Sequence, residues 1–67
     1  MKVKCNVCGN PNVIELSKPD YEYKESYCPD CSKLLAYVDV NSFNQLHWVV
    51  MDCVYNEDAG FIPVEIV

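Results

Sequence analysis

Four of the five cysteines in this chain form two pairs with two residues between the members of each pair: Cys5 with Cys8, and Cys28 with Cys31. Nineteen residues separate the two pairs, and this spacing is typical of zinc sites. Two intervening residues allow both thiolates of one turn to reach a single ion about 2.3 Å away, and two such turns complete a tetrahedron. The sequence therefore predicts one metal site with four thiolate ligands.

A site closed by four protein ligands leaves no position for water or substrate. We therefore expect one structural Zn²⁺ that contributes to folding, and no metal-centred catalysis. The sequence also shows no phosphate-binding loop and no constellation of nucleophile, base and orienting group, so we expect a protein that is not an enzyme. The alternative for the four cysteines is a reduced or disulfide-bonded set without metal.

Two further residues are capable of chemistry but lack the partners for it. Cys53 lies in an apolar run, where a free cysteine usually packs as a small hydrophobe; a reactive or regulatory thiol is the alternative. His47 has no identifiable third group with which to form a catalytic set, so we expect an ordinary surface or packing histidine.

The chain has 67 residues, and a core this small usually needs a metal or disulfides to stabilise it. Cys5 follows Met1 too closely for a secretory signal to precede it, so we expect a cytoplasmic protein in a reducing compartment, where paired cysteines bind metal. The longest apolar stretches are far shorter than the roughly 20 residues that cross a bilayer, so we expect no membrane partner.

The elements around the cysteines are predicted to be short strands. The first pair lies in a turn over residues 5–11, between strands at 2–5 and 12–16. The second pair follows residues 21–27, where tyrosines alternate with polar residues, and precedes a strand at 34–40. The sequence therefore predicts two hairpins joined by one ion. In the strand at 34–40, period-2 alternation predicts that one face carries Leu34, Ala36, Val38 and Val40.

Residues 41–67 are ambiguous. Ser42 to Gln45 fits a helix capping box, so a short helix at about 42–54 is one alternative. Residues 47–55 are nevertheless rich in β-branched and aromatic side chains, and 56–60 form a plausible loop before a strand-like run at 61–67, which favours a C-terminal β-hairpin. Pro63 cannot donate a ladder hydrogen bond, so the last strand is predicted to lie at a sheet edge or to expose that amide position to solvent.

The predicted fold is thus a small, mainly β single domain over residues 1–67, with two metal-knuckle hairpins and a C-terminal β-hairpin. It divides into a zinc module at 1–40 and an acidic C-terminal extension at 41–67 that packs on it. Within this domain, Trp48 and Phe61 are expected in the core. Tyr21, Tyr23 and Tyr27 are expected to cover the core or contact a protein.

The charge of the chain is uneven. The net charge is −5, and all five lysines lie in residues 1–33, whereas residues 34–67 contain five acidic residues and no base. These five are predicted to bind a partner: Asp39, Asp52, Glu57, Asp58 and Glu65. The absence of arginine, the residue that best grips phosphate and reads guanine, disfavours direct nucleic-acid binding.

Two segments resemble a known group of proteins. Cys5-Asn6-Val7-Cys8-Gly9 and Cys28-Pro29-Asp30-Cys31 are similar to the knuckles of zinc-ribbon proteins, and the likeness covers residues 2–40. It implies a ribbon fold and a zinc ion. Zinc ribbons occur in transcription factors, polymerase subunits, ribosomal proteins and small regulators, so the resemblance does not imply one activity.

The knuckles also resemble those of rubredoxin, an acidic iron electron carrier, through Cys8-Gly9 and Cys28-Pro29. The chain departs from rubredoxin at Asn10, where an aromatic residue is usual, at Ser32, where glycine is usual, and in a shorter segment between the knuckles. The missing glycine disfavours a redox iron site, because amides that approach the sulfurs tune the iron potential.

The sequence thus favours a zinc-stabilised regulator whose acidic surface binds or inhibits a larger protein with a basic surface. RNA polymerase or another nucleic-acid enzyme is a natural partner of this kind, and a phage- or plasmid-encoded regulator would suit the small size. One alternative is a nucleic-acid-binding zinc ribbon of the transcription or translation apparatus. The other is a rubredoxin-like iron electron carrier.

Overall fold

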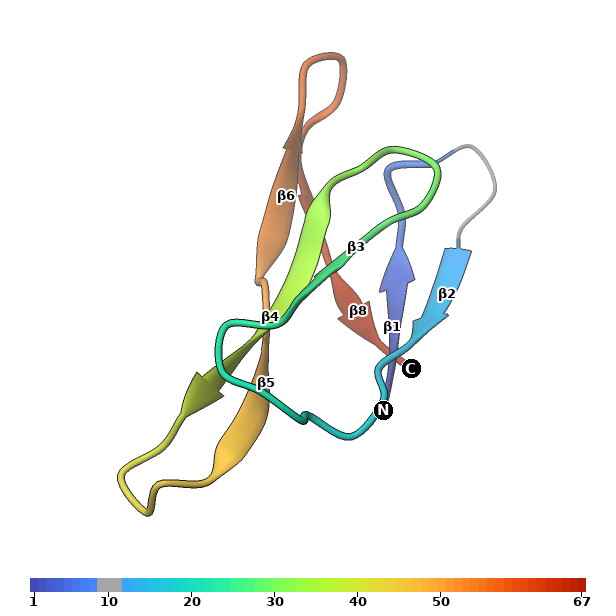
Figure 1. The fold of residues 1–67 in the computed structure, drawn as a ribbon. Helices are drawn as coiled ribbons and strands as arrows, with labels where there is room; N and C mark the ends of the chain where they lie inside the picture. Colours follow the sequence, from blue (N-terminus) through green and yellow to red (C-terminus); the bar gives the residue numbers. More distant parts are fainter. Residues whose placement is uncertain (9–11) are drawn as a thin grey trace.

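The computed structural model describes residues 1–8 and 12–67, and every regular element in this part of the chain is a β-strand. Eight short strands form three antiparallel sheets in a molecule of about 40 × 19 × 18 Å (Figure 1). The strands are β1 Lys2–Cys5, β2 Asn12–Glu15, β3 Glu25–Tyr27, β4 Leu34–Val40, β5 Leu46–Val50, β6 Cys53–Asn56, β7 Gly60–Pro63 and β8 Glu65–Ile66. The predicted small, mainly β fold is confirmed. Within the described residues there is no helix of the length and apolarity needed to span a membrane.

The first sheet has the order β2-β1-β8. β1 and β2 form the predicted first hairpin, in a register that places Cys5 opposite Asn12. β8 pairs with the other edge of β1, with Val3 opposite Ile66, and the Val67 N–H donates a 2.9 Å hydrogen bond to the Lys2 carbonyl. The two ends of the chain therefore lie close together (Figure 1).

The second sheet has the order β3-β4-β5, and β4 has the predicted bounds. A β-bulge changes which residues of β4 face the core. Ser26 pairs with Ala36 and Tyr27 pairs with Leu34, so Leu35 has no partner on β3. Leu35 joins Ala36 in the core, and the prediction that Leu34 shares a face with Ala36 is wrong. The extra residue of the bulge breaks the alternation on which that prediction relied.

The tyrosine-rich segment is extended over a shorter range than predicted. Only Glu25–Tyr27 forms a strand, because Tyr23 has a φ of 63°, a left-handed conformation that interrupts period-2 alternation. The Tyr23 N–H still donates a 3.0 Å hydrogen bond to the Val38 carbonyl, so this segment runs beside β4. Tyr21, Tyr23 and Tyr27 are all exposed.

The alternative of a helix at 42–54 is wrong. Residues 41–45 turn the chain between β4 and β5, and Asn44 has a φ of 60°. The side-chain oxygen of Asn41 accepts the N–H groups of Phe43 and Gln45, at 2.9 and 3.0 Å. The bond from Gln45 occupies the amide that a helix cap at Ser42 would have engaged, and the two bonds close a hairpin instead.

The predicted C-terminal hairpin is present as β6 and β7, which form the third sheet. The Asn56 side chain accepts the N–H groups of Asp58 and Ala59, and Gly60 has a φ of 79°, which glycine adopts without strain. Among the described strands, β7 pairs only with β6, so Pro63 lies in an edge strand as predicted.

Both strand-like runs of the C-terminal half are divided. The run at 47–55 breaks at Met51 and Asp52, and the Met51 N–H donates a 2.9 Å hydrogen bond to the Leu35 carbonyl. The run at 61–67 breaks at Val64. Because of these breaks, β5 adds a strand to the second cysteine hairpin and β8 adds one to the first. The C-terminal half therefore extends each cysteine hairpin to a three-stranded sheet.

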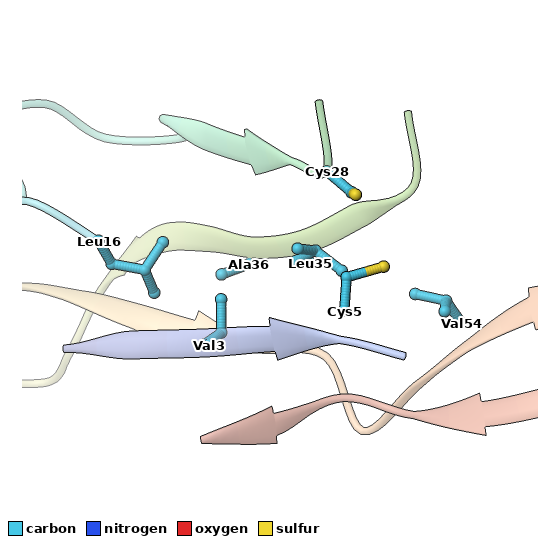
Figure 2. Close-up of a cluster of buried hydrophobic side chains, with 7 residues drawn as sticks. All are labelled: Val3, Cys5, Leu16, Cys28, Leu35, Ala36 and Val54. Atoms are coloured by element: carbon cyan, nitrogen blue, oxygen red, sulfur yellow. The ribbon is translucent and has the colours of Figure 1, made fainter. Parts of the chain in front are cut away.

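The core lies between β1 and β4, where Val3 points toward Ala36 (Figure 2). Among the described residues, eight side chains are buried: Val3, Cys5, Leu16, Cys28, Leu35, Ala36, Val38 and Val54. Trp48 is half-buried and packs against this core, as predicted. Phe61, in contrast, is 74 % exposed, so its predicted burial is wrong. It stacks edge-on against Tyr55 within the two-stranded β6–β7 hairpin, at a centroid distance of 5.4 Å.

Candidate metal centre

The two cysteine pairs lie at the same ends of their hairpins, where the chain turns from one strand to the next. Cys5 is the last residue of β1, and Cys8 lies in the turn toward β2. Cys28 follows the last residue of β3, and Cys31 lies in the turn toward β4. The sulfur atoms of Cys5 and Cys28 point toward the same region at the end of the core (Figure 2). We call residues 5–8 the first knuckle and 28–31 the second.

The four knuckle cysteines form one cluster in which all Sγ atoms lie within 4.8 Å of one another. The Sγ atoms of Cys8 and Cys28 are 3.4 Å apart, and those of Cys5 and Cys31 are 3.6 Å apart. A tetrahedron with metal–sulfur bonds of about 2.3 Å has sulfur–sulfur edges of about 3.8 Å. The cluster therefore has the donor set and the spacing to hold one metal ion.

The cluster is asymmetric with respect to solvent. The first cysteine of each knuckle, Cys5 or Cys28, is only 1 % exposed, whereas Cys8 and Cys31 are half-buried. Each of the two short sulfur–sulfur distances joins a buried cysteine of one knuckle to a half-buried cysteine of the other. A bound ion would thus be held from the core side by Cys5 and Cys28. It would be nearer to solvent on the side of Cys8 and Cys31.

The second knuckle is closed by backbone hydrogen bonds. The Ser32 N–H donates to the Cys28 carbonyl at 2.8 Å, and the Cys28 N–H donates to the Lys33 carbonyl at 2.9 Å. Ser32 has a φ of 59°, the left-handed conformation that glycine adopts most readily. The backbone at Ser32 therefore has the conformation expected of a knuckle glycine, although the residue carries a side chain.

The thiols of Cys5, Cys8 and Cys28 differ in pKa because their surroundings differ. Burial raises the pKa of the Cys28 thiol, but the backbone N–H groups of Cys31 and Asp30 favour the thiolate and lower that pKa to about 7. The hydrogen bond with Cys28 raises the pKa of Cys8 to about 12. Burial also raises the pKa of Cys5. Cys28 is therefore the thiol of these three that ionises most readily, and a cation is needed to hold the others as thiolates at neutral pH.

Asn12 is a neighbour of the cluster that the sequence pattern did not indicate. Its side-chain amide lies 3.9 Å from Cys28 Sγ and donates a hydrogen bond to Asp30 of the second knuckle. The signal for this role was the hairpin register, which places Asn12 directly opposite Cys5. Asn12 links the first hairpin to the second knuckle outside the thiol set and offers an N–H to a thiolate.

Other residues considered in the sequence lie apart from the cluster or outside the described residues. Gly9 and Asn10, the positions that carried part of the resemblance to rubredoxin, lie outside them. Cys53 is half-buried at the start of β6 and is not one of the clustered thiols. His47 is exposed in β5, opposite Asp39 of β4.

The five acidic residues predicted to bind a partner do not form one cluster. Asp39 lies in β4, Asp52 between β5 and β6, Glu57 and Asp58 in the β6–β7 loop, and Glu65 in β8. The β6–β7 loop and the β4–β5 turn lie at opposite ends of the molecule (Figure 1). Glu65 is also not isolated from bases, because its Oε2 lies 3.9 Å from Lys4 Nζ. The fold brings Glu65 next to a lysine that is distant in the sequence.

Comparison with protein-family models, curated proteins and solved structures finds no match to this chain. The identification of the site therefore depends on its own geometry. The protein is a small all-β chain with a cluster of four cysteines that fits one metal ion and is consistent with a zinc-ribbon-like site.

Proposed function

We propose that this protein is a zinc-stabilised, non-enzymatic regulator that binds a basic surface of a larger protein. The observation that carries the first part is the closed set of four thiols within 4.8 Å of one another. Four thiolates in tetrahedral spacing are the usual ligands of a structural zinc ion, and they leave no open position for a substrate. The part of the chain that the structure describes buries eight side chains, so the core gains from this ion free energy that apolar burial alone does not supply.

One observation favours iron as the alternative metal. Ser32 has a φ of 59°, so the departure from rubredoxin at this position leaves the backbone conformation of the knuckle unchanged. Amides directed at Cys28 are also the groups that tune an iron site. A rubredoxin-like electron carrier is therefore the second candidate function. Iron would give a coloured protein with reversible one-electron chemistry, whereas zinc would give a colourless one.

We propose a basic partner because the surface of this protein carries more negative than positive charge. Three lysines form ion pairs, with Glu15, Glu65 and Asp20, at 3.2 to 4.0 Å. Among the described residues, seven further carboxylates have no such ion pair, against two lysines. Excess negative charge of this kind speeds association with a basic surface and selects its orientation. It also opposes the third candidate, direct binding of nucleic acid by the ribbon.

A basic surface is typical of one class of partner protein. Enzymes that handle nucleic acids present basic grooves for phosphates, and a compact acidic protein that occupies such a groove would inhibit or regulate them. RNA polymerase is one example of a protein with such a groove.

The test is an affinity pull-down with the tagged, metal-loaded protein, from nuclease-treated lysate at low and high salt, with elemental analysis of the bait. We expect one zinc ion per chain and one basic protein that is released by high salt. Capture that depends on nucleic acid would contradict the proposal in favour of the nucleic-acid-binding ribbon. One iron ion per chain with reversible reduction would contradict it in favour of electron transfer.

A further inference from the structure

The face of the β3-β4-β5 sheet that points away from the core carries two hollows on either side of Tyr37. In the sheet register, Tyr37 lies between Glu25 of β3 and Val49 of β5. Tyr37 follows Ala36 in β4, and successive side chains of a strand point to opposite faces of the sheet. Because Ala36 points into the core, Tyr37 and the residues opposite it point outward. The β-bulge at Leu35 turns Leu34 to the same outer face.

The two hollows share one wall and extend across the sheet. The first has a volume of about 310 Å³ and is lined by Tyr23, Glu25, Leu34 and Tyr37. The second has a volume of about 410 Å³, and its lining residues come from β4, β5 and the start of β6: Tyr37, Val49, Val50, Met51, Asp52 and Cys53. Tyr37 lines both, so we call the pair of hollows the Tyr37 groove. Most of the lining side chains are apolar and only half-buried.

The charge at the Tyr37 groove has one sign. Glu25 lines one hollow and Asp52 lines the other, and neither forms an ion pair with a lysine in the described part of the chain. Asp39 projects from the same outer face of β4, two residues beyond Tyr37. No lysine is among the lining residues. An apolar floor with an acidic border is complementary to an apolar segment that carries positive charges.

This charge argues against a second copy of the chain as the occupant. A copy that used the same face would bring its own Glu25 and Asp52 against those of the first, and like charges at an interface cost several kcal/mol. A partner that contributes lysine or arginine beside its apolar side chains removes that cost. It would also engage Asp39 and Asp52, two of the acidic residues that the sequence singled out.

We propose that the Tyr37 groove is the docking site for a linear basic segment of the partner protein. The segment places one apolar side chain in each hollow, on either side of Tyr37, and its lysine or arginine residues face Glu25 and Asp52. This inference rests on the proposed function and locates it on one face of the molecule. It also separates this face from the β6–β7 loop, where Glu57 and Asp58 lie.

The probe for the test is a library of random linear peptides of about 12 residues, long enough for an extended chain to span roughly 40 Å. The library is displayed on phage and selected on the zinc-loaded protein, and the enriched peptide is then synthesised. Its Kd is measured for four variants in two matched pairs. Val49→Lys is compared with Val13→Lys on the exposed β2 strand, and Asp52→Lys is compared with Asp58→Lys in the β6–β7 loop. Zinc content and NMR dispersion verify the fold of each variant.

We expect enriched peptides that combine apolar residues with lysine or arginine. Val49→Lys and Asp52→Lys should each raise Kd by about ten-fold or more, while the two control variants change it by less than about three-fold. A basic peptide whose binding is weakened by Asp58→Lys and not by the groove variants would overturn this inference and leave an acidic docking surface standing. Failure to enrich basic apolar peptides would overturn the groove alone, because the pull-down tests the basic partner independently.

Discussion

The indole Nε1 of Trp48 donates a 2.7 Å hydrogen bond to the backbone carbonyl of Ser17, 31 positions earlier in the chain. Ser17 follows the first hairpin, and Trp48 lies in β5 of the second sheet. Trp48 also packs against the buried core. This one side chain therefore joins the C-terminal half to the segment that connects the two cysteine hairpins.

Replacing Trp48 with phenylalanine should destabilise the metal-loaded protein. The phenyl ring keeps much of the apolar contact but cannot donate to the Ser17 carbonyl, so the free energy of unfolding should fall by about 1 kcal/mol. Urea denaturation followed by far-UV circular dichroism measures the change. Phe43→Leu is the control, because Phe43 is 81 % exposed and its replacement should leave the midpoint nearly unchanged. Equal midpoints for Trp48→Phe and the parent would show that the hydrogen bond contributes nothing.

Removal of the metal should unfold most of the chain. Cys28→Ser removes a ligand from the closed set of four, and the small core does not compensate for the loss. We expect the amide NMR spectrum of Cys28→Ser, or of the parent with a chelator, to lose its dispersion. Cys53→Ser is the matched control, since Cys53 lies outside the cluster, and it should keep one metal ion per chain and a native spectrum. A dispersed spectrum for metal-free Cys28→Ser would refute a structural metal.

Stability should fall on acidification. The metal-bound fold holds four thiolates, while thiols in the unfolded chain have a pKa of about 8.5, so the unfolded state binds more protons below that pH. In the metal-free fold the pKa of Cys28 is lowered to about 7, so there its own contribution is complete above the unfolded value and is lost as the pH falls through 7. The pKa of Cys8, raised to about 12 by its bond with Cys28, makes this thiol dependent on the cation for ionisation.

With four protons taken up, the free energy of unfolding should change by up to about 5 kcal/mol per pH unit. Denaturation of the metal-loaded protein at steps from pH 8 to pH 5 measures this slope. Excess zinc should move the acid midpoint to lower pH by mass action. A stability that is independent of pH over this range would be incompatible with thiolate ligation.

Ser32→Gly should stabilise the protein. At a φ of 59° a side chain costs roughly 1–2 kcal/mol, and glycine removes that cost while adding up to about 1 kcal/mol of chain entropy to the unfolded state. The net gain should be about 0.5 kcal/mol, and Ser32→Val should lose more than 1 kcal/mol because a β-branched residue resists this conformation. Thermal unfolding of the three proteins with saturating zinc ranks them. Ser42→Gly, at an exposed turn position, is the control.

The first hairpin and the strand at 34–40 were predictable because their signals are local. Turn residues lie between short runs of strand-forming residues, and the cysteine spacing fixes where each turn must lie. Two features of this region were not predictable. The bulge at Leu35 exchanges Leu34 for Leu35 in the core, and the left-handed φ of Tyr23 ends the tyrosine alternation. Both are single-residue backbone irregularities that the pattern of apolar residues does not reveal.

The structure of the C-terminal half was harder to predict because its residues fit more than one type of secondary structure. Ser42 to Gln45 matched a helix cap, yet Asn41 takes the amides of Phe43 and Gln45 and turns the chain into a hairpin. The β6–β7 hairpin was predictable from its loop residues. The pairing of β8 with β1 was not, because it joins the two ends of the chain through hydrogen bonds that carry no side-chain signature.

The sequence by itself determined the four cysteines that cluster, the two knuckles and the β class, because cysteine spacing and strand alternation are local properties of the chain. Only the tertiary structure decided which acidic residues form no ion pair with a lysine, and where these residues lie. Contacts between distant segments pair Glu65 with Lys4, and strand register places Asp39 on the outer face near Tyr37. The Tyr37 groove likewise exists only because three strands from different parts of the chain pair side by side, and no segment of the sequence contains it alone.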